Sequence, residues 1–355
     1  MNALLWFVLV IGQEEALRSE DVTPVFQGVG DLAGGEFHSE ALGISDDGRV
    51  VFGKSGSGRS PEEGFLWTLE RGLVALGGLP EAEPRSEPRA ITPDGSIVVG
   101  KTGSPRGPCE AARWTAEGGW VPLGDIEGGD FASSALGITS DGRVIVGWGT
   151  SPHGLEAMGW LDGKPHVLGD LPGAAVNSAA SLVSADGRRI VGMGTSDRGR
   201  EVFVWQEDSG LSGLGDLAAG DFASEPFGMT PDGRTIVGRA SSGKGIEAFL
   251  WTLEAGMRPL GDLPGGGFES CALDVSTDGR TVVGFGTTAQ GVEAFLWDRV
   301  RGLRRVADVV GTFPGARLEG WSLRQATGVS GDGHWIVGTG TNPAGHTEGW
   351  VVHLP

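Results

Sequence analysis

A unit of roughly 46 residues recurs seven times along the chain, and this repetition constrains the fold more than any other feature of the sequence. The segments Leu214–Trp251 and Leu260–Trp297 are almost the same text, from LGDL through DGRT to EAFLW. An Asp-Gly pair marks each copy and begins at Asp47, Asp94, Asp141, Asp186, Asp232, Asp278 and Asp332. A tryptophan closes each copy with the same period, at Trp67, Trp114, Trp160, Trp205, Trp251, Trp297 and Trp350. Two markers with a common period indicate seven similar structural units in series.

Each unit contains four short apolar stretches that we expect to be β-strands. In the third copy they are residues 120–123, 135–139, 143–147 and 156–160, all too short for a helix. The Asp-Gly pair between the second and third stretches favours a tight hairpin turn. Residues 25–355 contain no sustained apolar period of 3.6, so we expect no helix there.

Four strands in each of seven units predict an all-β fold, a seven-bladed β-propeller of four-stranded antiparallel blades. The third stretch of each unit, such as RVIVG at 143–147, has consecutive apolar residues, as expected for a strand buried between neighbouring blades. The repeat begins on a fourth strand, Val25–Val29, and ends on a third strand, Gly349–Leu354. We therefore expect the N-terminal strand to pair with the last blade and close the ring, which removes two exposed edges.

The propeller is expected to occupy residues 24–355, after an apolar segment at 1–12 and a polar linker at 13–23. Ala3–Gly12 has the length of a signal-peptide core and is too short to span a membrane. A cleaved leader predicts a secreted or cell-surface protein. No Lys or Arg precedes the run, so an apolar tail on a cytoplasmic protein is the alternative. We expect a monomer.

The charge of the chain argues against two classes of partner. The formal net charge is −19, whereas nucleic acids and anionic membranes attract clustered Lys and Arg. Cys109 and Cys271 lie in repeats two and six, too far apart in a ring for a disulfide, which requires Cα atoms within about 7 Å. We therefore expect two free thiols.

The unit resembles the HAF-repeat family of extracellular repeats. The resemblance rests on LGDL, Ser-x-Ala, the Asp-Gly turn, Ile-Val-Gly and EAFLW, and it covers nearly all of Val25–Pro355. The His that names the family is Glu in six copies here, and His346 occupies that place in the seventh. The resemblance implies an extracellular location and no particular activity. The unit also looks like a WD40 blade, although it lacks the Gly-His pair of that family.

Polar residues that recur in six of the seven units are expected on one face of the propeller, which we call the top face. The connections between blades and the loops between the second and third strands of each blade share this face. The repeated residues are Asp31, Asp125, Asp170, Asp216, Asp262 and Asp308; Glu63, Glu110, Glu156, Glu201, Glu247 and Glu293; and Ser39, Ser86, Ser133, Ser178, Ser224 and Ser270. Such a ring could bind Ca²⁺ or another polar ligand. The alternative is that these groups join the blades, which sixfold repetition favours because one ligand rarely needs six copies.

Repeat seven breaks the regularity of the others. It is longer by roughly seven or eight residues, and the additional sequence lies in Gly311–Gln325, in a loop of the top face. This loop contains four residues of types that anchor interfaces, Phe313, Arg317, Trp321 and Arg324. Function tends to lie in loops that depart from a regular scaffold, so these residues are the first candidates for partner binding. The alternative is a loop that only caps the channel where the ring closes.

No catalytic constellation is evident, and the six His show no metal-ligand spacing. The first functional hypothesis is a non-catalytic interaction module that binds a protein or glycan through its top face. The second is a hydrolase or lyase that uses carboxylates of the same face, with or without a bound divalent cation. A scaffold without a specific ligand is a third.

Overall fold

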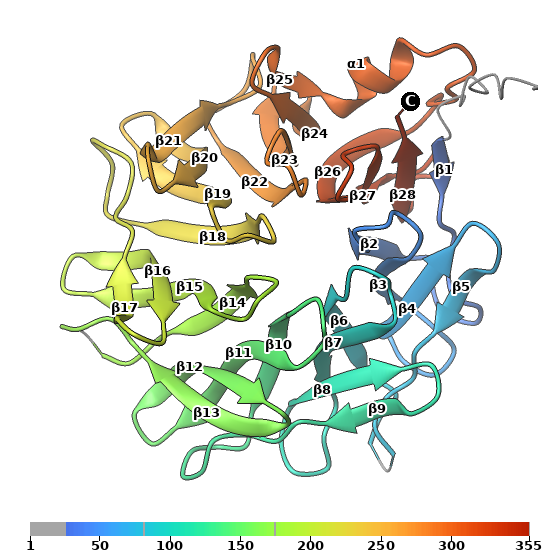
Figure 1. Cartoon of the computed structure of the whole chain (residues 1–355). Coiled ribbons are helices and arrows are strands. Elements are labelled where there is room, and N and C mark those ends of the chain that lie inside the picture. Colours follow the sequence, from blue (N-terminus) through green and yellow to red (C-terminus); the bar gives the residue numbers. More distant parts are fainter. Residues whose placement is uncertain (1–25, 81, 174, 355) are drawn as a thin grey trace, which may run out of the picture.

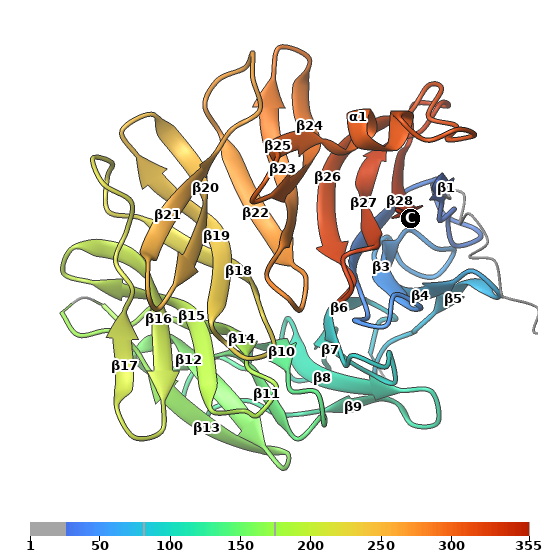
Figure 2. The same ribbon diagram turned by 45° about the horizontal axis from the view of Figure 1, so that its top comes forward.

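The computed structural model describes residues 26–80, 82–173 and 175–354, so the predictions made for residues 1–12 and 13–23 lie outside the described part. The chain forms seven separate four-stranded antiparallel sheets. The sheets stand as blades around a central axis, and Figures 1 and 2 show the ring from two directions. The predicted all-β, seven-bladed propeller is confirmed.

Six blades are continuous in sequence and are numbered in chain order, each from its innermost to its outermost strand. They are β2 (Ser39–Ile44), β3 (Val51–Ser55), β4 (Glu63–Thr68), β5 (Gly72–Ala75); β6 (Ser86–Ile91), β7 (Ile97–Thr102), β8 (Glu110–Thr115), β9 (Gly119–Pro122); β10 (Ser133–Ile138), β11 (Val144–Ser151), β12 (Gly154–Leu161), β13 (Lys164–Gly169); β14 (Ala179–Val183), β15 (Arg189–Ser196), β16 (Gly199–Gln206), β17 (Gly210–Gly213); β18 (Ser224–Met229), β19 (Thr235–Ser242), β20 (Gly245–Thr252), β21 (Gly256–Gly261); and β22 (Ser270–Val275), β23 (Thr281–Thr288), β24 (Gly291–Asp298), β25 (Gly302–Arg305).

The seventh blade combines the two ends of the described chain. Its strands are β26 (Ser322–Val329), β27 (Trp335–Thr341), β28 (Thr347–His353) and, outermost, β1 (Phe26–Gly28). β1 pairs antiparallel with β28, with Phe26 opposite Val352. The two strands lie side by side in Figure 1, so the predicted closure of the ring by the N-terminal strand is confirmed.

The register of the last blade differs from the one that the repeat suggested. Trp350 lies opposite Gly338, which is the place that Phe295 takes in blade six. Val352 takes the place of the closing Trp297. Trp350 is therefore not the closing tryptophan of repeat seven, and our alignment of that repeat was wrong by two residues. The repeat has a Phe at this position in blade six and a Trp here, and we took this Trp for the one that ends the motif.

The Asp-Gly turns lie at the end of each blade opposite the top face, which we call the bottom face. In blade five, Asp232 Oδ1 accepts hydrogen bonds from the Thr230 hydroxyl at 2.6 Å and the Arg234 amide at 3.0 Å. Gly233 has φ of +69°, a conformation that favours glycine. The same bonds recur in the other blades, so the repeated dipeptide is explained by the turn it forms.

One short helix, α1 (Val306–Gly311), follows β25, so the prediction of no helix was wrong. In the preceding blade the equivalent of Ala307 is Gly261, whose φ of +90° reverses the chain. An alanine disfavours that conformation, so the chain continues as a helical turn instead. Val306 and Val310 are buried in a cluster that also contains Trp350. No helix in the described residues is long and apolar enough to cross a membrane.

Candidate functional site

The repeated serines join neighbouring blades on the top face. Ser270, on the innermost strand of blade six, donates to the Gly261 carbonyl at 2.6 Å and accepts from the Ala248 amide at 2.9 Å, both in blade five. At the ring closure the Ser39 hydroxyl accepts from the Gly349 amide at 3.2 Å. All six serines are buried: Ser39, Ser86, Ser133, Ser178, Ser224 and Ser270. Their repetition is therefore explained by blade-to-blade hydrogen bonding.

The repeated glutamates lie at the start of the third strand of each blade, and most are removed from solvent. Glu63, Glu110, Glu201 and Glu247 are buried, whereas Glu156 and Glu293 are partly buried. The loop between the second and third strands supplies a partner in several blades. Glu63 pairs with Arg59, Glu110 with Arg106 at 3.1 Å and Glu201 with Arg198 at 3.5 Å. Their carboxylates are committed to the scaffold.

In blade seven this place belongs to Glu348 rather than His346. Glu348 lies opposite Gly340 in β27, just as Glu293 lies opposite Gly286 in blade six. Its Oε1 accepts from the Gly30 amide at 3.0 Å and its Oε2 from Asn342 Nδ2 at 2.7 Å. The glutamate is therefore present in all seven blades, and it helps to close the ring.

The aspartates organise the connections between blades. Asp262 accepts from the Leu263 and Glu269 amides at 2.7 and 2.8 Å, and from the Thr287 amide at 3.1 Å. Asp125, Asp170 and Asp216 each accept from the same two positions in their own loops, and Asp31 accepts from the Ser55 hydroxyl. Burial raises the pKa of Asp125 and of Asp216. Within the described residues, no group of three or more His, Cys, Asp or Glu is placed to hold a metal ion.

A second repeated feature of the top face was not recognised in the sequence. The cation of one blade's loop lies over a phenylalanine of the next connection, as in Arg106 over Phe131 at 4.8 Å and Arg198 over Phe222 at 4.3 Å. Lys244 lies over a phenylalanine in the same way, 5.1 Å from the ring centroid of Phe268. The signal was present, because a Phe stands two residues before the joining serine in four units. These pairs leave much of the top face internally satisfied.

Blade six breaks this pattern. Its loop carries the neutral, exposed Gln290 where blades one, two, four and five carry Arg59, Arg106, Arg198 and Lys244. Glu293 instead pairs with Arg305 at 3.3 Å, and the Arg305 guanidinium also binds Asp308 of α1 through two hydrogen bonds of 2.6 and 2.8 Å. The Asp308 carboxylate raises the pKa of Arg305. Asp308 therefore differs from Asp125, Asp170, Asp216 and Asp262, because the helix directs its carboxylate to an arginine instead of to loop amides.

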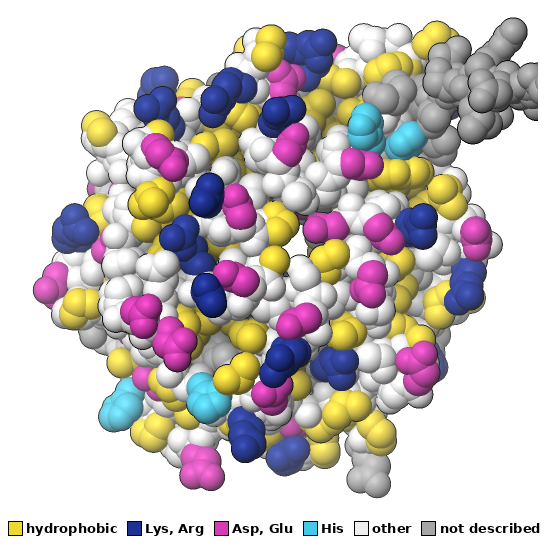
Figure 3. All heavy atoms as spheres, in the orientation of Figure 1, with side chains coloured by type: hydrophobic (Ala, Val, Ile, Leu, Met, Phe, Trp, Pro, Cys, Tyr) yellow, Lys and Arg dark blue, Asp and Glu magenta, His cyan; other side chains and the backbone are white. Residues whose placement is uncertain are grey.

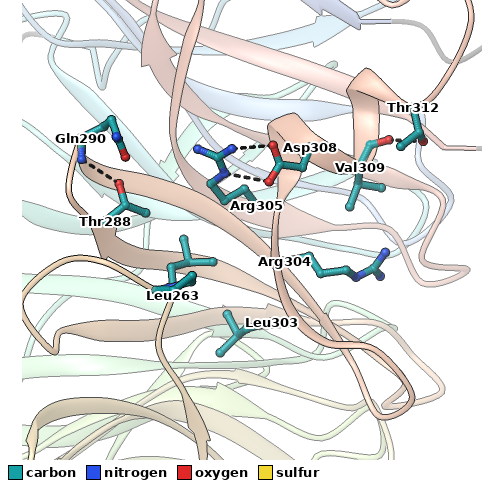
Figure 4. Close-up of a pocket in the computed structure, with 10 residues that line it drawn as sticks. Leu263, Thr288, Gln290, Leu303, Arg304, Arg305, Asp308, Val309 and Thr312 are labelled. Atoms are coloured by element: carbon teal, nitrogen blue, oxygen red, sulfur yellow. Dashed lines mark hydrogen bonds and ion pairs between the residues drawn. The ribbon is translucent and has the colours of Figure 1, made fainter.

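A pocket of about 480 Å³ lies between this helix and the loop of blade six. Figure 4 shows Leu263, Leu303 and Val309 among its apolar walls, with the Arg305–Asp308 pair facing Gln290 and Thr288. Both charges of that pair are already compensated. The pocket therefore offers a ligand apolar contact and few free polar groups.

The structure separates the four residues predicted to bind a partner. Trp321 is partly buried and packs edge-on against Phe26 of β1, with ring centroids 5.1 Å apart. Phe313 is also partly buried, whereas Arg317 and Arg324 are exposed. Trp321 thus packs against the outermost strand of blade seven, the strand that closes the ring. Leu323, which is buried, lies opposite Gly340 in the place that the joining Ser270 takes opposite Gly286, and Arg324 is the extra, exposed residue of a β-bulge in the innermost strand.

Arg324 lines a second pocket, of about 430 Å³, beside the mouth of the central channel. Its walls come from blades six, seven and one and are mainly polar: Glu40, Gln290, Ser322, Gln325, Thr327, Thr339 and Thr347, with Leu42 and Val292. Glu40 is engaged with His38 at 3.0 Å and Lys54 at 3.7 Å. No described acidic residue forms an ion pair with Arg324. We call this the Arg324 pocket, and Gln290 lies between it and the pocket of Figure 4.

The molecular surface in Figure 3 shows acidic and basic side chains interleaved around the central opening. No basic stripe runs across that face.

Both cysteines are free, as predicted, with Cys271 buried and Cys109 partly buried.

Comparison with known proteins supports the fold and assigns no family. No family model matches the chain, and no curated protein matches its sequence, so the resemblance to HAF repeats stays a prediction. An oligogalacturonate lyase from Vibrio parahaemolyticus is similar in structure, with a TM-score of 0.60 and 12% identity over 94% of this chain and 98% of that chain.

Two further structures are similar over less of the chain. The β-propeller domain of the trilobed protease from Pyrococcus furiosus has a TM-score of 0.50 and 15% identity, over 76% of this chain and 84% of that chain. TolB from Acinetobacter baumannii has a TM-score of 0.49 and 11% identity; the match covers 73% of this chain and 60% of TolB. At these identities the likeness to the lyase and to the protease domain shows a shared fold alone.

Proposed function

We propose that this protein is a non-catalytic interaction module that binds a protein or glycan at the Arg324 pocket on its top face. One observation carries the proposal. Blade seven lacks the joining serine, and a β-bulge in its innermost strand inserts an exposed arginine, Arg324, that has no ion pair in the described residues and lines a polar pocket. An unpaired charged side chain that a bulge adds at the most irregular junction of the ring is better explained by a ligand than by the scaffold.

A hydrolase or lyase would need carboxylates that can reach a substrate, and the state of the repeated carboxylates favours the binding module over the enzyme. Most of the repeated Glu are buried and several are paired with Arg, while most of the repeated Asp accept hydrogen bonds from loop amides. A general acid or base must be within hydrogen-bond reach of substrate. In the Arg324 pocket the one carboxylate is that of Glu40, which already has two partners.

The location that fits this function is outside the cytoplasm. The apolar run Ala3–Gly12 has the length of a leader core, and the repeat resembles an extracellular family. A secreted or surface-attached monomeric propeller with a polar pocket would meet soluble glycans or other surface proteins. Mass measurement of the secreted protein, with a cleavage after Gly12, tests the leader.

A matched pair of variants tests the proposed function. The ligand is sought with a glycan array and by affinity capture on immobilised wild-type protein, followed by mass spectrometry. Arg324→Ser removes the guanidinium of an exposed bulge residue and leaves a small polar side chain, and we expect it to reduce binding at least tenfold without lowering the melting temperature. Arg317→Ser removes an exposed arginine of the same insertion that does not line the pocket, and it serves as the control. Equal binding by wild type and Arg324→Ser would rule the site out.

A further inference from the structure

We infer that the ligand of the Arg324 pocket is a short oligosaccharide that carries carboxylate groups, such as an oligomer of a uronic acid. The inference rests on the proposed function and specifies its ligand. It depends on which charges of the pocket are compensated, which donors and acceptors line it, and what the rest of the protein repels.

The balance of charges in the pocket predicts the sign of the ligand's charge. Two charged side chains line the pocket, Arg324 and Glu40, and Glu40 has Lys54 and His38 as partners. The guanidinium of Arg324 is the charge left without an opposite one in the described structure. A planar guanidinium presents parallel N–H donors that match the two oxygens of a carboxylate. An anionic group of the ligand is therefore expected at Arg324.

The uncharged lining indicates a sugar. Gln290 and Gln325 offer amide donors and acceptors, and Ser322 and Thr347 offer hydroxyls. The hydroxyls of Thr327 and Thr339 donate to the Ala41 carbonyl at 2.8 and 3.4 Å, which leaves their oxygens free to accept. Such groups suit sugar hydroxyls, which donate and accept at once. A peptide partner would need apolar wells for its anchoring side chains, and only Leu42 and Val292 provide apolar wall here.

The charge of the whole chain limits the length of the ligand. A net charge of −19 repels a long polyanion, and cationic loop residues of the other blades, such as Arg106 and Arg198, are already paired with buried glutamates. A volume of about 430 Å³ lies within the range of about 300–1,000 Å³ typical of small-molecule pockets. Both features favour a short acidic oligosaccharide over a charged polymer.

Isothermal titration with a matched pair of sugars tests the inference. The probes are a tri- or tetrasaccharide of a uronic acid and the same oligosaccharide with its carboxyls methyl-esterified, with inorganic phosphate as a third arm. We expect the free acid to bind at least tenfold more tightly than the ester, and phosphate to bind more weakly than the acid. Arg324→Ser should lose at least tenfold in affinity for the acid and nothing for the ester. Arg324→Lys keeps the charge but not the fork and should fall between them.

The outcomes separate this inference from the proposed function. Equal affinity for acid and ester, or unchanged affinity in Arg324→Ser, overturns the acidic-sugar assignment. Phosphate binding as tight as that of the acid also overturns it, because the site would then read charge alone. If only a neutral glycan or a protein binds, and Arg324→Ser weakens it, the proposed function stands and the ligand class is wrong. If no captured ligand depends on Arg324, both fail.

Discussion

Asp274 should make this propeller less stable as the pH rises from 5 to 8. It lies on the innermost strand of blade six, where the equivalent residue of blade five is Gly228. Its Oδ1 accepts from the Val275 amide at 2.8 Å and its Oδ2 from the Val329 amide of blade seven at 2.9 Å. Burial, with a smaller contribution from Asp46, raises the pKa of Asp274 to about 7. The carboxyl is therefore wedged between two blades in a site that favours its neutral form.

The sign and size of the effect follow from this pKa. In the unfolded chain the carboxyl titrates near 3.8, so between pH 4 and 7 the folded state holds a proton that the unfolded state has lost. Stability must fall as the pH rises through that window. Integrating the two titrations from pH 5 to pH 8 gives a loss of about 2–3 kcal/mol. The turn aspartates whose pKa values are lowered, such as Asp232, act below pH 4 and do not contribute.

The assay compares wild type and Asp274→Asn by urea unfolding at pH 5 and pH 8. The amide is isosteric and keeps one acceptor but does not ionise. His353, whose pKa is lowered by burial, is present in both proteins, so its contribution cancels in the comparison. We expect the difference in unfolding free energy between the two proteins to shift by about 2–3 kcal/mol in favour of the variant from pH 5 to pH 8. A difference that is the same at both pH values would refute the assignment.

Three further predictions concern the scaffold. Gly48 and Gly72 both have positive φ, but only Gly48 packs against Trp335 across the ring closure, so Gly48→Ala should cost about 1–3 kcal/mol more than Gly72→Ala in urea unfolding; equal costs would contradict that packing. Deleting residues 1–30 removes β1 and exposes the edge of the last blade, and it should lower the melting temperature by many degrees, whereas a shorter deletion that spares the strand should not. An unchanged melt would refute closure. Burial raises the pKa of Cys271 to about 12, so in the native protein at pH 8 a thiol reagent should modify Cys109 first, and labelling of both at one rate would count against this.

The fold could be predicted from the sequence because every level of the repeat points to the same structure. Short apolar stretches, an Asp-Gly turn and a fixed period give four strands and a hairpin in each unit. The phase of the chain, which starts on a fourth strand and ends on a third, predicted the pairing of β1 with β28. These features depend on local turn chemistry and on burial, both of which a sequence displays directly.

Two predictions were wrong, and in both cases one unit carries a different residue from the other units at a position of the repeat. Trp350 took a phenylalanine's place and shifted our alignment by two residues. Ala307 replaced a turn glycine, and the chain formed α1 where a loop was expected. The helix could have been predicted from the sequence, because alanine disfavours the positive φ that the other units use at the position of Ala307. The place of Trp350 could not be predicted without the strand register, since EGWVV and EAFLW are both reasonable third strands.

The candidate site could not be predicted from the sequence, because it depends on which side chains contact one another in the folded ring. The sequence of the insertion does not distinguish its candidate residues Arg317, Trp321 and Arg324. In the structure Trp321 packs on Phe26, whereas Arg324 lines a pocket formed by three blades. The repeated Glu and Asp looked like a ring of functional groups, and the structure gives most of them scaffold partners. A propeller satisfies its own polar groups by repetition, so a residue that departs from the repeat and gains no partner in exchange is the better indicator of a ligand. By that criterion Arg324 stands apart from Arg305, which also departs from the repeat but is paired with Glu293 and Asp308.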